Sequence, residues 1–98
     1  KGAAEGDAFA MERSGFLYSE GFGDVGPDPG MAFEWFLRAA MEGVTSAMTT
    51  VGRCYLAGTG VEASVDEAAK WLRMASENGD EEARAELERL GPKGLPKK

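Results

Sequence analysis

One segment, Gly52-Arg53-Cys54-Tyr55-Leu56-Ala57-Gly58-Thr59-Gly60, indicates the architecture, because it repeats an earlier segment of the same chain. Gly15-Phe16-Leu17-Tyr18-Ser19-Glu20-Gly21-Phe22-Gly23 carries its glycines and its tyrosine at the same places, 37 positions upstream. Trp35 likewise returns as Trp71, 36 positions downstream. A period between about 20 and 50 residues is typical of stacked repeats, in which each unit buries its apolar face against its neighbour. The sequence therefore predicts a stacked array.

Each repeat contains a helix with clear start and stop signals. In the first repeat, Asp28 is placed to cap a helix that begins at Pro29, and Gly43 ends it. In the second repeat, the capping box Ser64-Val65-Asp66-Glu67 begins the helix and Gly79 ends it. Apolar residues recur at helical spacing in both. They are Ala32, Trp35, Phe36, Ala39 and Ala40 in one helix, and Ala68, Trp71, Leu72 and Ala75 in the other.

A further helix precedes each of these, over about residues 7–20 and about residues 45–57. The positions predicted to form the packed side of these first helices are Ala10, Ser14, Leu17 and Tyr18, matched by Ala47, Val51, Cys54 and Tyr55. No stretch shows a sustained alternation of β-branched residues, so no strand is expected. The pattern favours an all-α fold.

The two ends follow the same register. Residues 80–90 repeat the start of a first helix, but Glu88 replaces the glycine found at positions 15 and 52, and most other positions are charged. A polar outer face is typical of a terminal capping helix. We therefore expect the end of a preceding repeat at 1–5, repeats at 6–42 and 43–78, a capping helix at 79–91 and a loose tail at 92–98. On this basis we expect the chain to be the C-terminal piece of a longer array.

The spacing Ala-x-Ala-x4-Gly-x2-Tyr-x2-Gly-x-Gly, followed by Ala-x2-Trp-x3-Ala and a closing Gly, resembles the Sel1-like repeat, a relative of the tetratricopeptide repeat. The resemblance covers about residues 6–90 and recurs in register. The first repeat supplies Ala8, Ala10, Gly15, Tyr18, Gly21, Gly23, Ala32, Trp35, Ala39 and Gly43. The second supplies Ala47, Gly52, Tyr55, Gly58, Gly60, Val61, Ala68, Trp71, Ala75 and Gly79. The departures are Thr45 and Ser46 at the start of a first helix, Ser14 at an apolar position, and a lengthened loop over residues 24–28.

The resemblance implies an α-solenoid of stacked antiparallel helix pairs, whose first helices line a concave face, and a role as an adaptor or scaffold that binds a partner peptide or helix. Fold-level analogy does not identify the partner. The first-helix and capping-helix positions that the repeat pattern leaves free to face that side are the candidate binding residues. They are Phe9, Glu12, Arg13, Phe16, Ser46, Thr49, Thr50, Arg53, Glu86 and Arg89, with Ser19, Glu20, Leu56, Ala57, Glu82 and Ala85 beside them.

Phe9 and Phe16 are the apolar members of this set. They are seven positions apart and so lie on one stripe of a helix, where they would anchor a partner helix or peptide. The alternative is that a preceding repeat covers both rings.

Composition excludes several other classes of function. Among 98 residues, 11 Lys and Arg stand against 17 Asp and Glu, a formal charge of −6, which disfavours a sequence-independent grip on nucleic acid. The chain has no His and one Cys, Cys54, so zinc fingers, the usual hydrolase triads and a disulfide framework are excluded. No apolar run approaches the roughly 20 residues that span a bilayer. We expect no enzyme activity, no cofactor and no metal.

Three local motifs have plainer interpretations. Residues 21–26 have the glycine spacing of a dinucleotide-binding loop, but no strand precedes them, which favours an interhelix turn. Asp24 and Asp28 are too few for a calcium site, and Asp28 serves better as a cap. Cys54 shares the register of Leu17, which favours a buried small apolar role over a reactive thiol.

Two alternatives to the adaptor remain. One is a ligand-processing hydrolase of the Sel1-like group. Members of that kind carry paired cysteines, whereas this chain has one cysteine. The other is a purely structural array that associates with itself through the exposed N-terminal end.

Overall fold

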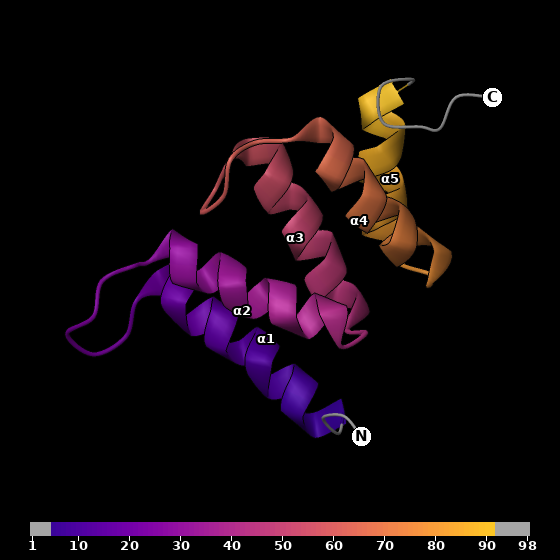
Figure 1. The fold of residues 1–98 in the computed structure, drawn as a ribbon. Coiled ribbons are helices and arrows are strands. Elements are labelled where there is room, and N and C mark those ends of the chain that lie inside the picture. The colour runs from indigo at the N-terminus through magenta and orange to yellow at the C-terminus, as the bar shows by residue number, and fades with distance from the viewer. Residues whose placement is uncertain (1–4, 92–98) are drawn as a thin grey trace.

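A computed structural model describes residues 5–91, which form five helices in chain order (Figure 1). They are α1 (Glu5–Glu20), α2 (Pro29–Met41), α3 (Thr45–Ala57), α4 (Val65–Glu77) and α5 (Glu81–Leu90). Within residues 5–91 the sole β feature is an isolated bridge between Phe22 and Val25. The predicted all-α class is confirmed. The predicted tail at 92–98 and most of the predicted preceding repeat at 1–5 lie outside the described residues.

The helix starts read from the sequence are confirmed by their hydrogen bonds. The Asp28 carboxylate accepts from the backbone N–H of Met31 at 3.1 Å, and the Ser64 hydroxyl accepts from that of Glu67 at 3.2 Å. Each bond satisfies an N–H that has no partner within its own helix. Residues 21–27 form the interhelix turn between α1 and α2, in which Phe22 and Val25 exchange backbone hydrogen bonds of 2.8 Å.

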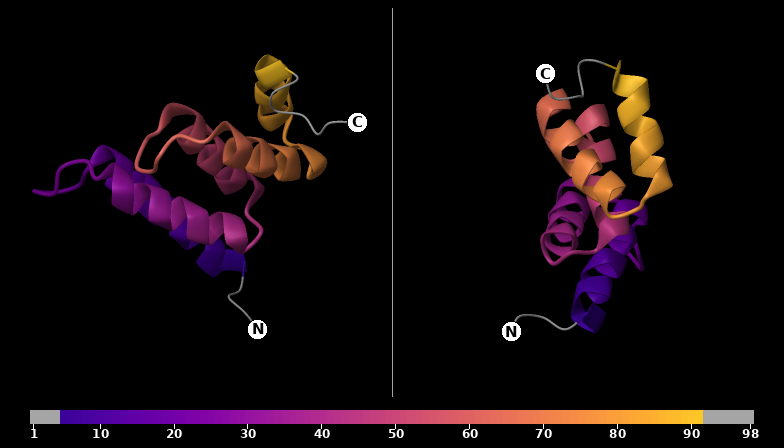
Figure 2. Two further views of the ribbon diagram at one scale, coloured as in Figure 1. Left: turned by 45° about the horizontal axis from the view of Figure 1, so that its top comes forward. Right: turned by 90° about the vertical axis from the view of Figure 1, so that its right-hand side faces the viewer.

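The helices stack as an α-solenoid. Each one packs mainly against its neighbours in the chain, α1 on α2, α2 on α3, α3 on α4 and α4 on α5. In Figure 2, α1 (indigo) and α5 (yellow) lie at opposite ends of the stack, and α3 lies between α2 and α4. The molecule is correspondingly elongated, with extents of 47 × 30 × 19 Å.

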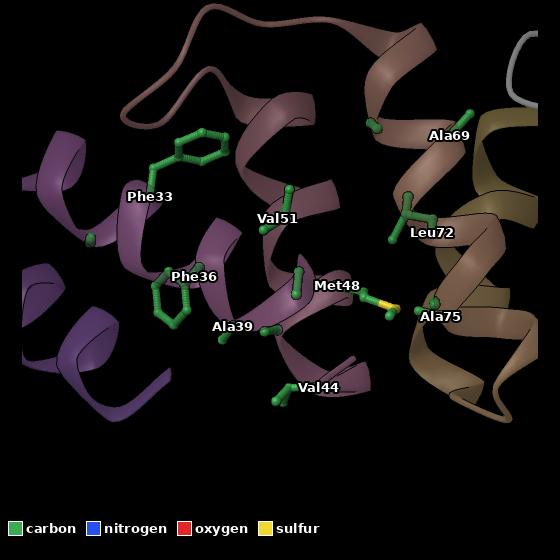
Figure 3. Close-up of a cluster of buried hydrophobic side chains, with 14 of the residues drawn as sticks. Phe33, Phe36, Ala39, Val44, Met48, Val51, Ala69, Leu72 and Ala75 are labelled. Carbon is green, nitrogen blue, oxygen red and sulfur yellow. The ribbon is translucent and has the colours of Figure 1, made fainter. Parts of the chain in front are cut away.

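The repeated glycines let the two helices of each pair approach closely. A Cβ atom at Gly52 would lie 2.6 Å from Cγ of Leu72, and one at Gly15 would lie 2.8 Å from the ring of Phe36. Leu72 and Phe36 both belong to the core, which runs along the stack between the helices (Figure 3). The 37-residue period of the sequence is therefore the period of these close helix crossings.

The prediction for the packed side of α1 is wrong in part. Ala10 is exposed and Leu17 is 47 % exposed, whereas their counterparts in α3 are fully buried Ala47 and half-buried Cys54. The reason is position, since α3 lies between α2 and α4, while α1 packs mainly against α2 alone.

Candidate partner-binding surface

A hollow of about 420 Å³ lies where the start of α3 meets α1. The α2–α3 turn, residues 42–44, forms one wall, and Thr45 and Ser46 continue it. Ala8 and Phe9 of α1 form the other wall, and Phe9 is 55 % exposed. We call this site the Phe9 hollow.

Polar contacts tie α1 to α3 beside the hollow. The Ser46 hydroxyl donates a hydrogen bond to the carboxylate of Glu12, and the Thr50 hydroxyl donates to the backbone carbonyl of Ser46 at 3.0 Å. Three predicted residues from two helices, Phe9, Glu12 and Ser46, therefore meet at one place on the surface. An apolar ring next to a carboxylate can hold an apolar side chain and a donor of a ligand at the same time.

Thr49 does not face outward as predicted. It is 2 % exposed, and its hydroxyl donates a hydrogen bond to the carboxylate of Asp80, the residue that caps α5. This bond, together with backbone N–H bonds from Glu82 and Ala83, lowers the pKa of Asp80. Thr49 therefore links α3 to the start of α5, and because it is buried it cannot contact a partner.

Three other charged candidates, Arg53, Glu86 and Arg89, form a second group on α3 and α5. Arg53 lies 3.2 Å from the carboxylate of Glu82 and 3.4 Å from that of Glu86, and Arg89 lies 3.9 Å from Glu86. These ion pairs are solvent-exposed at Arg53 and Arg89, so each contributes little to stability. The pairs orient the side chains of Arg53, Glu86 and Arg89 in a row that runs from α3 to α5.

The other candidates on α1 have different surroundings. Phe16 is exposed on one side, but its ring meets the ring of Phe36 edge-on, with centroids 5.0 Å apart. It therefore contributes to packing as well as to the surface. Arg13 is exposed, and among the described residues it has no ion-pair partner.

Other chemistry on the described part of the chain is limited. Burial raises the pKa of the half-buried Cys54 thiol, which disfavours the thiolate, the nucleophilic form. In residues 5–91, His, Cys, Asp and Glu side chains form no group of three or more suited to a metal ion. None of the five helices is both long and apolar enough to cross a membrane.

Sequence reasoning missed the wall of the hollow formed by residues 42–44, because it selected residues from the first helices and the capping helix alone. The signal that was available is Gly43, which takes a positive φ of 102° and turns the chain so that Val44 leads directly into α3. Such a turn brings the end of one second helix beside the start of the next first helix.

A family model for the Sel1 repeat matches the chain twice, over residues 8–44 and 45–80. Among solved structures, the chain is similar to a Sel1 repeat protein from Oxalobacter formigenes, with 36 % identity, a TM-score of 0.81 and 90 % of this chain covered. It is also similar to c5321, a protective antigen of uropathogenic Escherichia coli with an SLR fold, with 31 % identity, a TM-score of 0.78 and 85 % of this chain covered.

Among curated proteins, the chain is similar to the chitin synthase regulator SKT5 of Saccharomyces cerevisiae, with 39 % identity over 56 residues, or 57 % of this chain. The match spans 8 % of that regulator, and the chain spans 36 % and 18 % of the two structural relatives.

Proposed function

This chain belongs to the Sel1 repeat family, and we propose that it is a non-catalytic module that binds a peptide or helix of a partner protein at the Phe9 hollow. Sel1 repeat proteins are generally protein-interaction scaffolds without catalytic activity. A relative named as a regulator of another protein is in keeping with such a role.

The observation that carries the proposal is the exposed ring of Phe9 at the wall of a hollow of about 420 Å³. The counterpart of Phe9 in the second repeat is Ser46, so stacking of the repeats does not require an aromatic ring at this position. An aromatic side chain beside a concave site is a typical anchor for a partner. Glu12 and Ser46 supply the polar groups that orient it.

Arg53, Glu86 and Arg89 extend the proposed surface toward α5, whereas Thr49 is left out of it because it is buried. Arg13 and Phe16 of α1 and Thr50 of α3 lie on the helices that border the hollow, and they remain candidate contact residues. We propose that an apolar side chain of the partner enters the hollow and that polar groups of the partner contact Arg53, Glu86 and Arg89.

The test is capture of partners from the source lysate by the immobilised chain, wild type beside Phe9→Ser. This substitution copies the residue of the second repeat. The matched control is Met41→Glu, which also removes an exposed apolar side chain but lies outside the hollow. Circular dichroism first establishes that all three proteins are equally helical.

We expect a partner that is retained by wild type and by Met41→Glu and lost by Phe9→Ser. Chemical crosslinking of that partner to residues of α1 or α3 would locate the contact. Equal retention by all three proteins would move the binding site away from the hollow.

A further inference from the structure

A second hollow, of about 460 Å³, lies along α2 and shares no residue with the Phe9 hollow. Its walls are one side of α2 and the α3–α4 loop. The lining residues are Gly30, Phe33, Glu34, Leu37, Arg38, Met41, Gly60 and Val61. Nothing in the proposed function uses this surface.

The apolar residues of this hollow form a continuous stripe. Phe33, Leu37 and Met41 follow one another at a spacing of four, so they lie on the same side of α2. At 1.5 Å per residue, Phe33 and Met41 are about 12 Å apart along the helix. Phe33 is buried at one end, while Met41 projects at the other and is 71 % exposed.

Stacking of the repeats accounts for two of these three residues. Phe33 is buried with its ring edge-on to that of Tyr55 in α3, and Leu37 packs, partly buried, against the core. Met41 is exposed, and its counterpart in α4 is Glu77, so the fold does not need an apolar residue at this position. Met41 therefore projects beside a hollow whose lining includes Phe33 and Leu37.

Two residues of opposite charge, Glu34 and Arg38, lie along one edge of the stripe. Glu34 and Arg38 are both exposed, and among the described residues neither takes part in an ion pair. The Arg38 guanidinium lies over the Trp35 ring, 4.8 Å from its centroid, which holds it at this edge.

We propose that this stripe binds the same stripe of a second copy of the chain, with the two α2 helices antiparallel about a two-fold axis near Leu37. A two-fold contact requires a patch that is complementary to itself. Reversing one helix places Met41 of one copy over Phe33 and the hollow of the other. Because both charges lie on the same edge, the reversal also sets Glu34 of one copy beside Arg38 of the other.

The contact is small, because a single helix of 13 residues supplies most of it. Interfaces below about 1,200 Å² are typically weak and transient. The dimer therefore forms at high protein concentration, and its mass depends on concentration.

The test is sedimentation equilibrium of the chain from about 10 µM to about 1 mM, a range that brackets weak association. The disrupting variant is Met41→Glu, which installs the α4 residue at an exposed position and so leaves the core intact. We expect it to weaken the dimer at least tenfold. Phe9→Ser and Leu17→Glu are the matched controls, since each alters an exposed apolar residue elsewhere, and both should dimerise like wild type.

Charge reversal tests the register of the pairing. Glu34→Arg and Arg38→Glu should each weaken the dimer, and the two together should restore much of it. A wild-type chain that stays monomeric throughout would overturn the proposal. So would a dimer that survives Met41→Glu, or one that Leu17→Glu abolishes, which would place the contact on α1. Because Phe9 lies outside this surface, failure here leaves the proposed function untouched.

Discussion

At the scale of single residues, the surrounding structure restricts the choice of side chain much more at some positions than at others. Gly15 and Gly52 are constrained by contact, because the opposing core side chains leave no room for a Cβ atom. Thr49 and Asp80 are constrained by a hydrogen bond between helices. Phe9 is constrained by neither, which supports its proposed role in binding a partner.

Gly52→Ala tests the close crossing of α3 and α4. The added methyl group would lie 2.6 Å from Cγ of the fully buried Leu72, so the core must shift. Overpacking of this kind typically costs about 1–3 kcal/mol, and alanine recovers part of it, about 1 kcal/mol, through its better helix propensity. We expect a net loss, measured by urea unfolding. Gly30→Ala is the control, because its nearest neighbour would lie 3.6 Å away, and it should be neutral or slightly stabilising.

Asp80→Ala removes both the cap of α5 and the acceptor of the buried Thr49 hydroxyl. Loss of a cap costs about 1 kcal/mol. The buried Thr49 hydroxyl keeps only a long hydrogen bond of 3.5 Å to the Thr45 carbonyl, and loss of its bond to Asp80 costs about 1 kcal/mol more. We expect about 2 kcal/mol of lost unfolding free energy for Asp80→Ala. Asp28→Ala, which removes a cap alone, should lose about half as much. Equal losses would show that the Thr49 bond contributes nothing.

The Asp80 carboxylate also makes stability depend on pH. Its pKa is lowered in the folded protein from an ordinary value of 3.8, chiefly by the hydrogen bond from Thr49. The folded state therefore binds the proton less readily than the unfolded state, so the stabilisation is full above that value and is lost as pH falls through the lower, folded pKa. The difference in unfolding free energy between wild type and Asp80→Asn should shrink over this acid range. A difference that stays constant with pH would contradict the assignment.

At the scale of helices, α3 and α1 show how one sequence pattern gives two outcomes. Val51 of α3 is fully buried between α2 and α4, while its counterpart in α1, Ser14, is only half-buried. Leu17 is exposed for the same reason. The helical period of the sequence indicates which side of a helix is apolar, but the neighbouring helices decide whether that side is covered.

Two truncations measure this difference. Val51→Ala opens a cavity in the fully packed core, and we expect a loss of about 2 kcal/mol of unfolding free energy. Leu17→Ala removes a larger but half-exposed side chain, and we expect less than about 1 kcal/mol. Chemical unfolding of both variants provides the comparison. A larger loss for Leu17→Ala would show that α1 is covered in solution.

At the scale of the whole molecule, the solenoid is a linear stack in which each helix depends mainly on its neighbours in the chain. The inner helices α2, α3 and α4 each have packed neighbours on both sides, whereas α1 and α5 each pack mainly on one, and α3 is the farthest from both ends. Local stability should follow this order, because opening an end helix exposes less apolar surface than opening the centre.

Hydrogen exchange of the backbone amides tests this gradient. We expect the amides of α3 to be the most protected and those of α1 and α5 the least, with α2 and α4 between them. Uniform protection would indicate that the stack opens only as one unit. The measurement belongs at low protein concentration, where the proposed contact through α2 is not populated.

The repeat period, the helix caps at Asp28 and Ser64, the all-α class and the family could all be predicted from the sequence, because they depend on local chemistry and on spacing along the chain. The burial of Thr49, the exposure of Leu17 and the part of the α2–α3 turn in the Phe9 hollow follow from tertiary packing. Those outcomes depend on which helix lies beside which. A residue's own position in a repeat does not contain that information, since the same position is covered in the middle of the stack and open at its end.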